Sequence, residues 1–206
     1  DGWAQGPMNG HVTLRRRQVL ASVHGLRFAQ HMIRGKIHNQ RVLLRRNAKV
    51  SLDASVLDQL KELETKAESA ASLETLLGIE GTAARLYFRQ FHKLLSPRLE
   101  VAAEFQAHGR ARRPPPDPVN AVLGFFYSLL TKDLVAVLTG VGLDPFLGVL
   151  HQPRYGRPAL ALDLAEEFRA LVAESVALQC LNNGEINEKS FMRGHLGVAL
   201  TADGRR

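Results

Sequence analysis

Residues 76–95, LLGIEGTAARLYFRQFHKLL, decide the fold because they predict a helix that carries one carboxylate on its apolar side. At 100° per residue, the apolar and basic side chains of this stretch separate onto different faces. The apolar face comprises Leu76, Leu77, Ala83, Ala84, Tyr87, Phe88 and Phe91, and the basic face comprises Arg85, Arg89 and Lys93. Glu80 lies in the middle of the apolar face. A carboxylate in a protein core is costly unless it is protonated, paired with a cation or bound to a metal.

Two explanations of Glu80 are compatible with this stretch alone. In the first, Ser72 caps the start of the helix and Glu80 pairs with an arginine. In the second, Glu80 binds a metal ion, and the two alanines one turn along leave space beside it. Structural ion pairs outnumber metal sites, so the stretch taken alone favours the first explanation.

The composition of the whole chain is that of a globular, basic protein. Its 206 residues are 45% hydrophobic, which is enough for one large domain with a real core. The formal net charge of +7 favours nucleic acid or another polyanion as a partner. The single cysteine, Cys180, excludes an internal disulfide and a cysteine-based zinc cluster, and this fits a cytoplasmic protein.

Neither a membrane helix nor a secretion signal is predicted. The longest apolar run, AVLGFFYSLL at residues 121–130, is about half a bilayer span and is followed at once by Lys132 and Asp133. The chain begins at Asp1 without a methionine and without a charged-then-apolar signal pattern. We therefore expect a piece of a longer product that is not secreted.

A strongly basic helix is predicted from Leu14 to about Arg46, where apolar residues recur at helical spacing between arginines and lysines. Asp1 is the only acid before Asp53 that could offset these bases. Most charged helix faces are simply solvated, but phosphate contacts explain an unneutralised patch better. The residues expected to contact a nucleic-acid backbone from this helix are Arg41, Arg45 and Arg46.

The rest of the chain completes the prediction of an all-α fold. A helix is predicted over residues 52–66, and after a break at Pro97 the next helical stretch leads into a flexible, basic, proline-rich loop at residues 108–118. Asp117 and Pro118 then start a helix that is apolar nearly all round and is expected to be central. The closing sequence GVALTADGRR predicts a small hairpin around residues 202–204.

The helix predicted over residues 161–181 has a pair of acids beside its expected buried stripe. Asp163 and Glu166 are three residues apart and project from one side within reach of one cation. The alternative, which this stretch taken alone favours, is a capping box, in which Asp163 caps the helix and Glu166 reaches back to the backbone. The stripe expected to be buried comprises Leu164, Phe168, Leu171 and Val172.

Together with Glu80, these acids and a histidine form a candidate metal site. His151 belongs to a basic loop, HQPRYGRPAL, in which an ordinary solvated histidine is the simpler reading. Mixed oxygen and nitrogen donors suit Mn²⁺ or Mg²⁺, and the histidine favours Mn²⁺. A metal ion with arginines around it is what phosphoryl transfer requires.

Several separated motifs follow one another along the chain from about Arg41 to its end. They are GIEGTAARLYF (78–88), RRPPPDPVNAVLGFFYSLL (112–130), GLDPFLGVLHQPRYGRPALALDLAEEFR (142–169), INEKSF (186–191) and ADGRR (202–206). In this order they resemble the CRISPR-associated adaptation integrases, the Cas-one family. The resemblance implies a helical catalytic domain, a preceding β-domain that dimerises, and a complex with a small second adaptation protein, Cas-two.

The resemblance also implies which residues act. In that family the glutamate of the GxEG motif, the histidine after GLDPxxGxL and an acid of the DLxEEF motif bind Mn²⁺ or Mg²⁺. Carried over, these ligands are Glu80, His151 and Glu166, with Asp163 as an auxiliary acid. Arg85, Arg154 and Arg157 are the candidates for phosphate clamps, because a guanidinium matches a phosphate bidentately.

The chain departs from the family pattern at its N-terminus. Residues 1–13 resemble only the last edge of the β-domain and are interpreted as a remnant or linker, and residues 14–206 form the helical integrase domain. We therefore expect a larger polypeptide, in which the integrase follows a domain such as a reverse transcriptase or a Cas-four-type nuclease.

The resulting functional hypothesis is a metal-dependent DNA endonuclease and integrase that inserts spacers into a CRISPR array by transesterification. Double-stranded DNA is its expected partner. Two alternatives stay open at this level. One is a helical nucleic-acid-binding scaffold in which the carboxylates serve as caps and ion pairs, and the other is a related integrase of a mobile element.

Overall fold

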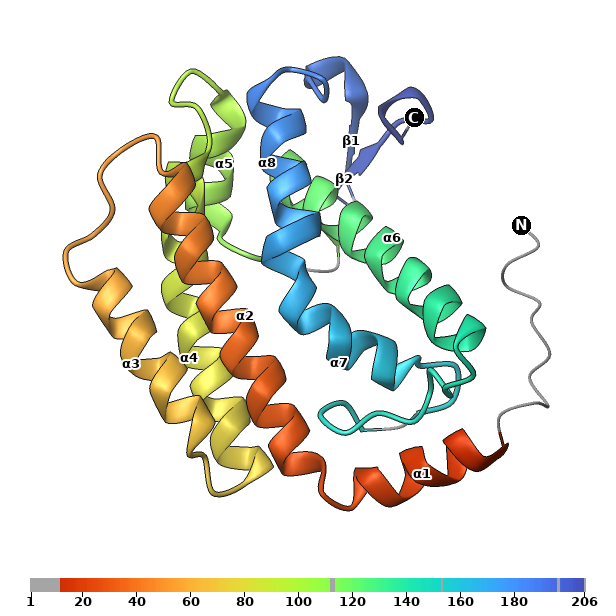
Figure 1. Cartoon of the computed structure of the whole chain (residues 1–206). Coiled ribbons are helices and arrows are strands. Elements are labelled where there is room, and N and C mark those ends of the chain that lie inside the picture. The colour runs from red at the N-terminus through yellow and green to blue at the C-terminus, as the bar shows by residue number, and fades with distance from the viewer. Residues whose placement is uncertain (1–11, 112–113, 153, 196, 206) are drawn as a thin grey trace.

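The computed structural model describes residues 12–111, 114–152, 154–195 and 197–205. It confirms the helical fold with a small antiparallel hairpin near the C-terminus (Figure 1). The longer elements are α1 (Val12–Ser22), α2 (Gly25–Asn47), α3 (Val56–Glu68), α4 (Leu73–Phe91), α5 (Glu100–His108), α6 (Pro118–Gly140), α7 (Ala159–Phe168) and α8 (Ser175–Asn182). A π-helical segment, Arg169–Glu174, joins α7 to α8.

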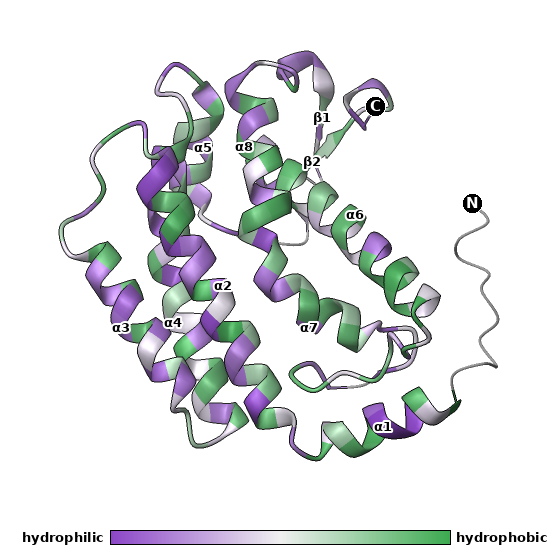
Figure 2. Ribbon diagram, viewed as in Figure 1, coloured by the Kyte–Doolittle hydropathy of each residue, from purple (hydrophilic) through white to green (hydrophobic). Residues whose placement is uncertain are grey.

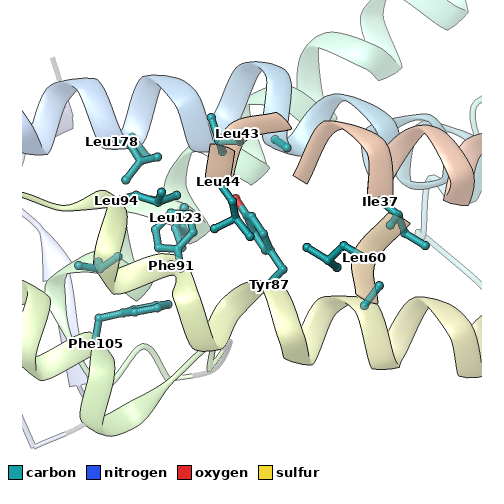
Figure 3. Packing of buried hydrophobic residues seen from close by; sticks show 14 of the residues in the cluster. Ile37, Leu43, Leu44, Leu60, Tyr87, Phe91, Leu94, Phe105, Leu123 and Leu178 are labelled. Carbon is teal, nitrogen blue, oxygen red and sulfur yellow. The ribbon is translucent and has the colours of Figure 1, made fainter. Parts of the chain in front are cut away.

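Helix α2 is the centre of the packing. It lies against α3 and α4 on one side and against α7 and the π-helical segment on the other. An aromatic cluster continues the core from α4 to α5, with Tyr87 against Phe91 at 5.8 Å within α4 and Phe91 against Phe105 of α5 at 5.4 Å between ring centroids (Figure 3). Edge-on and tilted aromatic pairs of this kind add stability beyond the area they bury. The packing therefore fixes α4, which carries Glu80, against α2.

The starts of α4 and α6 follow the capping signals of the sequence. The Ser72 hydroxyl accepts a hydrogen bond from the Thr75 amide at 3.1 Å, as predicted. The Asp117 carboxylate accepts one from the Asn120 amide at 2.8 Å, and Pro118 occupies the first turn of α6. Each cap satisfies a backbone donor that a helix start leaves without a partner.

The prediction of one long basic helix from Leu14 to Arg46 is wrong. The chain turns at Val23 and His24, so that α1 and α2 are separate helices. Gly25 begins α2 at a close approach, where an added Cβ would lie 2.2 Å from the Val149 side chain. α1 contains no residue that is buried in the described part of the chain, and Gln18 ties it to the Asp144 amide and carbonyl. The expected β remnant at residues 1–13 falls outside the described residues except for Val12 and Thr13, which are helical.

Helix α6 is central only at its start. Its residues Pro118–Leu123 are buried, but Val137 further along is 61% exposed. By length and composition alone α6 could cross a membrane, which is weak evidence, because core helices meet the same criterion. Here α6 packs along α5, α7, α8 and the hairpin. Much of its ribbon has the green of hydrophobic residues in Figure 2.

The buried stripe predicted for residues 161–181 is also wrong. Phe168, Leu171 and Val172 are exposed, by 39%, 52% and 44%. The buried face instead carries small and acidic residues, namely Ala161, Asp163, Ala165, Glu166, Ala170, Ala173 and Glu174. Alanines let α2 and α6 approach closely, and the acids are each satisfied by specific partners. Burial of polar groups is tolerated when they are hydrogen-bonded or paired.

The C-terminal hairpin exists but lies earlier than predicted. Strand β1 (Phe191–Gly194) pairs with β2 (Gly197–Leu200), so the turn falls between Gly194 and Gly197 and not around residues 202–204. Residues Asp203–Arg205 form a short 3₁₀ turn. The Val198 amide donates to the Pro115 carbonyl at 2.9 Å, which anchors the proline-rich loop to β2.

Candidate active site

A buried lysine joins two of the predicted ligands. The ammonium of Lys36, on α2, contacts the Glu80 carboxylate on α4 and lies 2.6 Å from Glu166 Oε2 on α7. Lys36 is only 4% exposed, and the side chains of Glu80 and Glu166 are 23% and 6% exposed. The structure therefore brings together carboxylates 86 positions apart, but it does so around a lysine and not around an arginine.

Sequence reasoning missed Lys36, although a signal existed. Met32, Ile33, Lys36 and Ile37 occupy helically spaced positions on the buried stripe of α2. A charged residue on an apolar stripe is the same anomaly that singled out Glu80. The basic pattern of residues 14–46 instead assigns Lys36 to the charged face of the predicted helix.

Close packing between α2 and α7 lets Lys36 reach both carboxylates. A Cβ added at Gly35 would lie 2.8 Å from the Glu167 side chain, so the two helices meet at this glycine. The Asn39 side-chain amide donates to the Glu167 carbonyl at 2.9 Å and fixes the two helices in register. Lys36, between these two contacts in sequence, therefore projects towards α7.

His151 is held by Asp163, and this arrangement replaces the predicted capping box. The Asp163 carboxylate is fully buried in the middle of α7. It accepts hydrogen bonds from the backbone amides of Val149, Leu150 and His151 at 2.6–2.9 Å, and it lies 2.7 Å from His151 Nδ1. Asp163 thus shapes the loop and orients the imidazole. A carboxylate in this position fixes the ring so that Nε2 is left for another partner.

The second nitrogen of His151 points towards the acidic pair. His151 Nε2 lies 3.9 Å from Glu166 Oε1, and Arg169 Nη1 lies 3.0 Å from the same oxygen. Burial by itself raises the pKa of Glu166, but Lys36 and Arg169 outweigh it and leave that pKa below its ordinary value. Glu166 is therefore held as a carboxylate with one oxygen towards Lys36 and the other towards Arg169.

Another buried carboxylate, Glu174, lies at the end of the π-helical segment. Its two oxygens accept hydrogen bonds from Tyr87 and Tyr127, each at 2.5 Å. Burial raises the pKa of Glu174 despite these bonds, and it also raises the pKa of both tyrosines. The Tyr127 hydroxyl thus has a carboxylate partner, whereas that of Ser128 donates to the Gly124 carbonyl at 2.9 Å. Arg169 lies 4.9 Å from the centre of the Tyr127 ring, which steadies the guanidinium beside Glu166.

The predicted phosphate clamps lie in different places. Arg85 is five residues beyond Glu80 and so faces about 140° away from it around α4. With Arg89 and Arg110 it lines a cleft of about 510 Å³ between α4 and α5. Arg154 and Arg157 face each other across a tight turn of the loop that follows His151. Tyr155, at the tip of this turn, is fully exposed and was not singled out from the sequence.

The basic residues of α2 divide into two groups. Arg41 is 3.3 Å from the Glu64 carboxylate, which is buried, and its own side chain is 16% exposed. Arg45 and Arg46 are exposed in the last turn of the helix. Arg27 and Arg34 are exposed on α2 as well, so arginines reach solvent along this helix and not only in its last turn.

The donor set fits a divalent cation, but one side chain stands in the way. Two carboxylates and an imidazole nitrogen, from α4, α7 and the loop before α7, converge on one small region, and such donors suit Mn²⁺ or Mg²⁺. Among the described residues, no three histidine, cysteine or acidic side chains are close enough to hold a metal as placed. The Lys36 ammonium separates the two carboxylates, so a bound cation requires this lysine to move.

The sequence comparisons identify a family. The model of the family "CRISPR associated protein Cas1" matches residues 1–206. A Cas4/endonuclease Cas1 fusion from Geobacter sulfurreducens is 45% identical over 88% of this chain and 33% of that protein. A CRISPR-associated endonuclease Cas1 from Thermus thermophilus is 47% identical over 81% of this chain and 47% of that protein. The chain thus spans a third to a half of these curated relatives.

Solved structures agree with the fold. A Cas1 protein from Thermotoga maritima superimposes with a TM-score of 0.82 at 28% identity, over 98% of this chain and 62% of that one. A chain of a partial Cas6-RT-Cas1–Cas2 complex gives 0.75 at 33% identity, over 88% of this chain and 55% of that one. A casposase bound to an integration product superimposes with a TM-score of 0.79 at 24% identity, over 96% of this chain and 55% of that one. This similarity concerns the fold alone. The chain belongs to the Cas1 family, as its motifs predicted.

Proposed function

We propose that this chain is the catalytic part of a metal-dependent DNA endonuclease and integrase that inserts short DNA segments into a CRISPR array. One observation carries the proposal: Glu80 and Glu166, from two different helices, meet at the buried Lys36 ammonium, and His151 Nε2 lies 3.9 Å from Glu166. Curated relatives of this chain are named CRISPR-associated endonucleases. Buried clusters of this kind with perturbed carboxylates are typical of functional sites.

In the proposed reaction, a 3′ hydroxyl of the incoming DNA attacks a phosphodiester of the repeat. A new phosphorus–oxygen bond forms, the old one breaks, and the proton of the attacking hydroxyl passes to solvent while the leaving strand keeps its 3′ oxygen. When bound by Glu80, His151 and Glu166, Mn²⁺ or Mg²⁺ would stabilise charge on the phosphate and leaving oxygens. No covalent enzyme intermediate is required.

The chain's own residues would position the substrate. Asp163 holds His151 in one orientation through the bond to Nδ1, and Arg169 steadies Glu166. Arg154 and Arg157 lie on the loop that begins at His151, so they are the arginines placed to bind a phosphate beside the site. Arg85 would contact DNA from the cleft between α4 and α5, away from the reacting groups.

We further propose the partners of the whole protein from those of its relatives. The titles of two similar structures describe Cas6-RT-Cas1–Cas2 complexes, and curated relatives are Cas4/Cas1 fusions. By analogy, this chain would act in a cytoplasmic polypeptide carrying a reverse transcriptase or Cas4-type domain, as a homodimer with a Cas2-type protein and double-stranded DNA.

The competing candidate is a nucleic-acid-binding scaffold without chemistry. Lys36 favours it, because an ammonium between Glu80 and Glu166 satisfies both carboxylates without any metal. On this view the buried charges stabilise the contact between α2, α4 and α7. The two candidates differ in what a change at His151 does.

The test measures strand transfer of a fluorescent DNA duplex into a repeat-bearing plasmid, with Mn²⁺ or with a chelator. We expect joining only with Mn²⁺, and a loss of about 100-fold or more in His151→Ala, because the imidazole is one of three ligands. His31→Ala, which changes an exposed histidine of α2, is the matched control and should retain activity.

The same assay separates the candidates. Retained DNA binding with lost joining in His151→Ala supports the integrase. If the full-length protein binds DNA but neither joins nor nicks it with Mn²⁺ or Mg²⁺, the scaffold is the correct description. A plasmid without the repeat, used as target, distinguishes CRISPR integration from the target choice of a mobile-element enzyme.

A further inference from the structure

A buried lysine occupies the position between the two carboxylates of the proposed metal centre. Lysines are almost never this deeply buried unless they are paired, and Lys36 is paired twice. The two partners come from different helices, α4 and α7, and neither is a near neighbour of Lys36 in sequence. The ammonium therefore does for Glu80 and Glu166 what a bound cation would do.

The charges around the site set a limit on what can bind together. The Glu80 and Glu166 carboxylates already have two cationic partners, Lys36 and Arg169, while the carboxylates of Asp163 and Glu174 are engaged by His151 and by two tyrosines. A divalent cation bound by Glu80 and Glu166 would lie beside the Lys36 ammonium. In the described part of the chain, Lys36 forms ion pairs with no other carboxylate that could offset the added charge. Two positive charges that are both in contact with the same carboxylates repel each other strongly in a buried site, so binding of both at once is unfavourable.

We propose that Lys36 is the resident counter-ion of this site, which holds Glu80 and Glu166 together in the metal-free protein and must be displaced when a divalent cation binds. The inference rests on the metal centre of the proposed function, and it adds Lys36 as a residue that sets the affinity of this centre for the divalent cation. Lys36 is a positioning residue in the metal-free state and a competitor of the metal.

The structure allows the displacement. A lysine carries a compact charge on a flexible four-carbon stem, so its ammonium can move without movement of α2. Glu80 is the more exposed of the two carboxylates, at 23%, which leaves an opening to solvent on that side. Glu174 lies within electrostatic reach of Lys36, so a displaced ammonium still has a negative neighbour.

The first measurement is direct binding of Mn²⁺ to the full-length protein, by calorimetry and by loss of the free-Mn²⁺ electron paramagnetic resonance signal. Lys36→Met keeps the length of the side chain and removes its charge. We expect it to bind Mn²⁺ about tenfold more tightly than the wild type, the scale on which neighbouring groups change metal affinity. Lys36→Arg keeps the charge and should bind no more tightly than the wild type.

Lys93→Met is the matched control. Lys93 also pairs with a carboxylate, that of Asp53 at 2.6 Å, but it lies on another part of the surface. Its loss should leave Mn²⁺ affinity unchanged. Without metal, Lys36→Met should melt at a lower temperature than the wild type, and saturating Mn²⁺ should raise its melting temperature by more than it raises that of the wild type.

A second measurement uses the wild type alone, so it does not depend on the variant folding. Amine-reactive labelling read by mass spectrometry should modify Lys36 slowly without metal and faster with Mn²⁺, whereas labelling of Lys93 should not change. Equal labelling of Lys36 in both conditions, or a folded Lys36→Met that binds Mn²⁺ no more tightly than the wild type, would overturn the proposal. If instead the wild type and Glu80→Gln bind Mn²⁺ equally, the metal centre of the proposed function fails first.

Discussion

At the scale of single residues, this site is a set of buried charges with assigned partners. Asp163 accepts from three backbone amides, Glu166 is shared by Lys36 and Arg169, and Glu174 accepts from two tyrosines. Removing one partner from such a set leaves another buried group unsatisfied, which costs more than the bond itself contributes. The change in stability caused by a substitution here therefore reflects the whole set of paired buried charges and not a single contact.

The raised pKa of Glu174 predicts how the stability of the protein depends on pH. Burial raises its folded-state pKa above the ordinary value of 4.5, so the folded protein binds the proton more tightly than the unfolded chain. The wild type should thus lose stability as pH rises from about 4.5 through the raised pKa. The side chain at position 174 cannot titrate in Glu174→Gln. This variant should therefore lack the contribution of Glu174 to the slope of unfolding free energy against pH, which is at most about 1.4 kcal/mol per pH unit.

The measurement is the free energy of unfolding in urea for both proteins between pH 4 and pH 8. The opposite contribution of Glu166, whose pKa is lowered, is common to both proteins and cancels in their difference. A difference that does not change with pH would contradict the assignment of the raised pKa to Glu174.

At the scale of elements, the site depends on how closely helices and loops approach. Gly35 allows α2 to meet α7, and Gly148 allows the loop before His151 to lie on the start of α7. At Gly148 an added Cβ would lie 2.7 Å from the Ala159 carbonyl carbon and 2.9 Å from Asp163 Oδ2. The backbone of α7 cannot move away without disturbing the contact between Asp163 and His151.

Gly148→Ala should therefore destabilise the protein by about 1–3 kcal/mol, the usual cost of overpacking, and should reduce strand transfer more than it reduces DNA binding. Gly124→Ala is the matched control, because among the described residues no neighbouring element comes within 4 Å of its added Cβ. In the interior of α6 it should stabilise by about 0.5–1 kcal/mol. Thermal melts check both, and equal melting temperatures for the two variants would refute the close approach at Gly148.

At the scale of the whole molecule, the surface carries several separate groups of basic side chains and also some large apolar side chains that are exposed to solvent. The last turn of α2, the cleft between α4 and α5, and the turn after His151 each expose arginines. Helix α6 and the α7–α8 region expose large apolar residues, among them Val137 and Leu171. With a formal net charge of +7, binding of DNA by this protein should be governed by phosphate contacts and sensitive to salt.

We expect the affinity for a DNA duplex to fall linearly on a plot of log K against log salt. Replacing Arg45 and Arg46 together by glutamine should reduce the slope by about 2, because each phosphate contact contributes about 0.9. Arg34→Gln is the control, since Arg34 is 3.6 Å from Glu68 and partly neutralised. Fluorescence anisotropy from 50 to 300 mM salt measures the slopes, and an unchanged slope in the double variant would exclude these arginines from the interface.

The sequence by itself determined the class of fold, the family and most of the candidate site. Helical periodicity, the caps at Ser72 and Asp117, and an acid on the apolar face of α4 are local properties, because they depend on residues within a few turns. Glu80, His151, Asp163 and Glu166 could be named in advance because they stand in motifs that resemble those of the Cas1 family, and the structure places Asp163 in contact with His151.

Only the tertiary structure decided which face of each helix is buried and which cation meets the carboxylates. The α7–α8 region buries alanines and acids in place of its larger apolar residues, because close approach to α2 and complete pairing of the acids outweigh hydrophobicity there. Lys36 reaches Glu80 and Glu166 across 44 and 130 positions of sequence. Such contacts follow from the packing of three helices against one another, which no local pattern encodes.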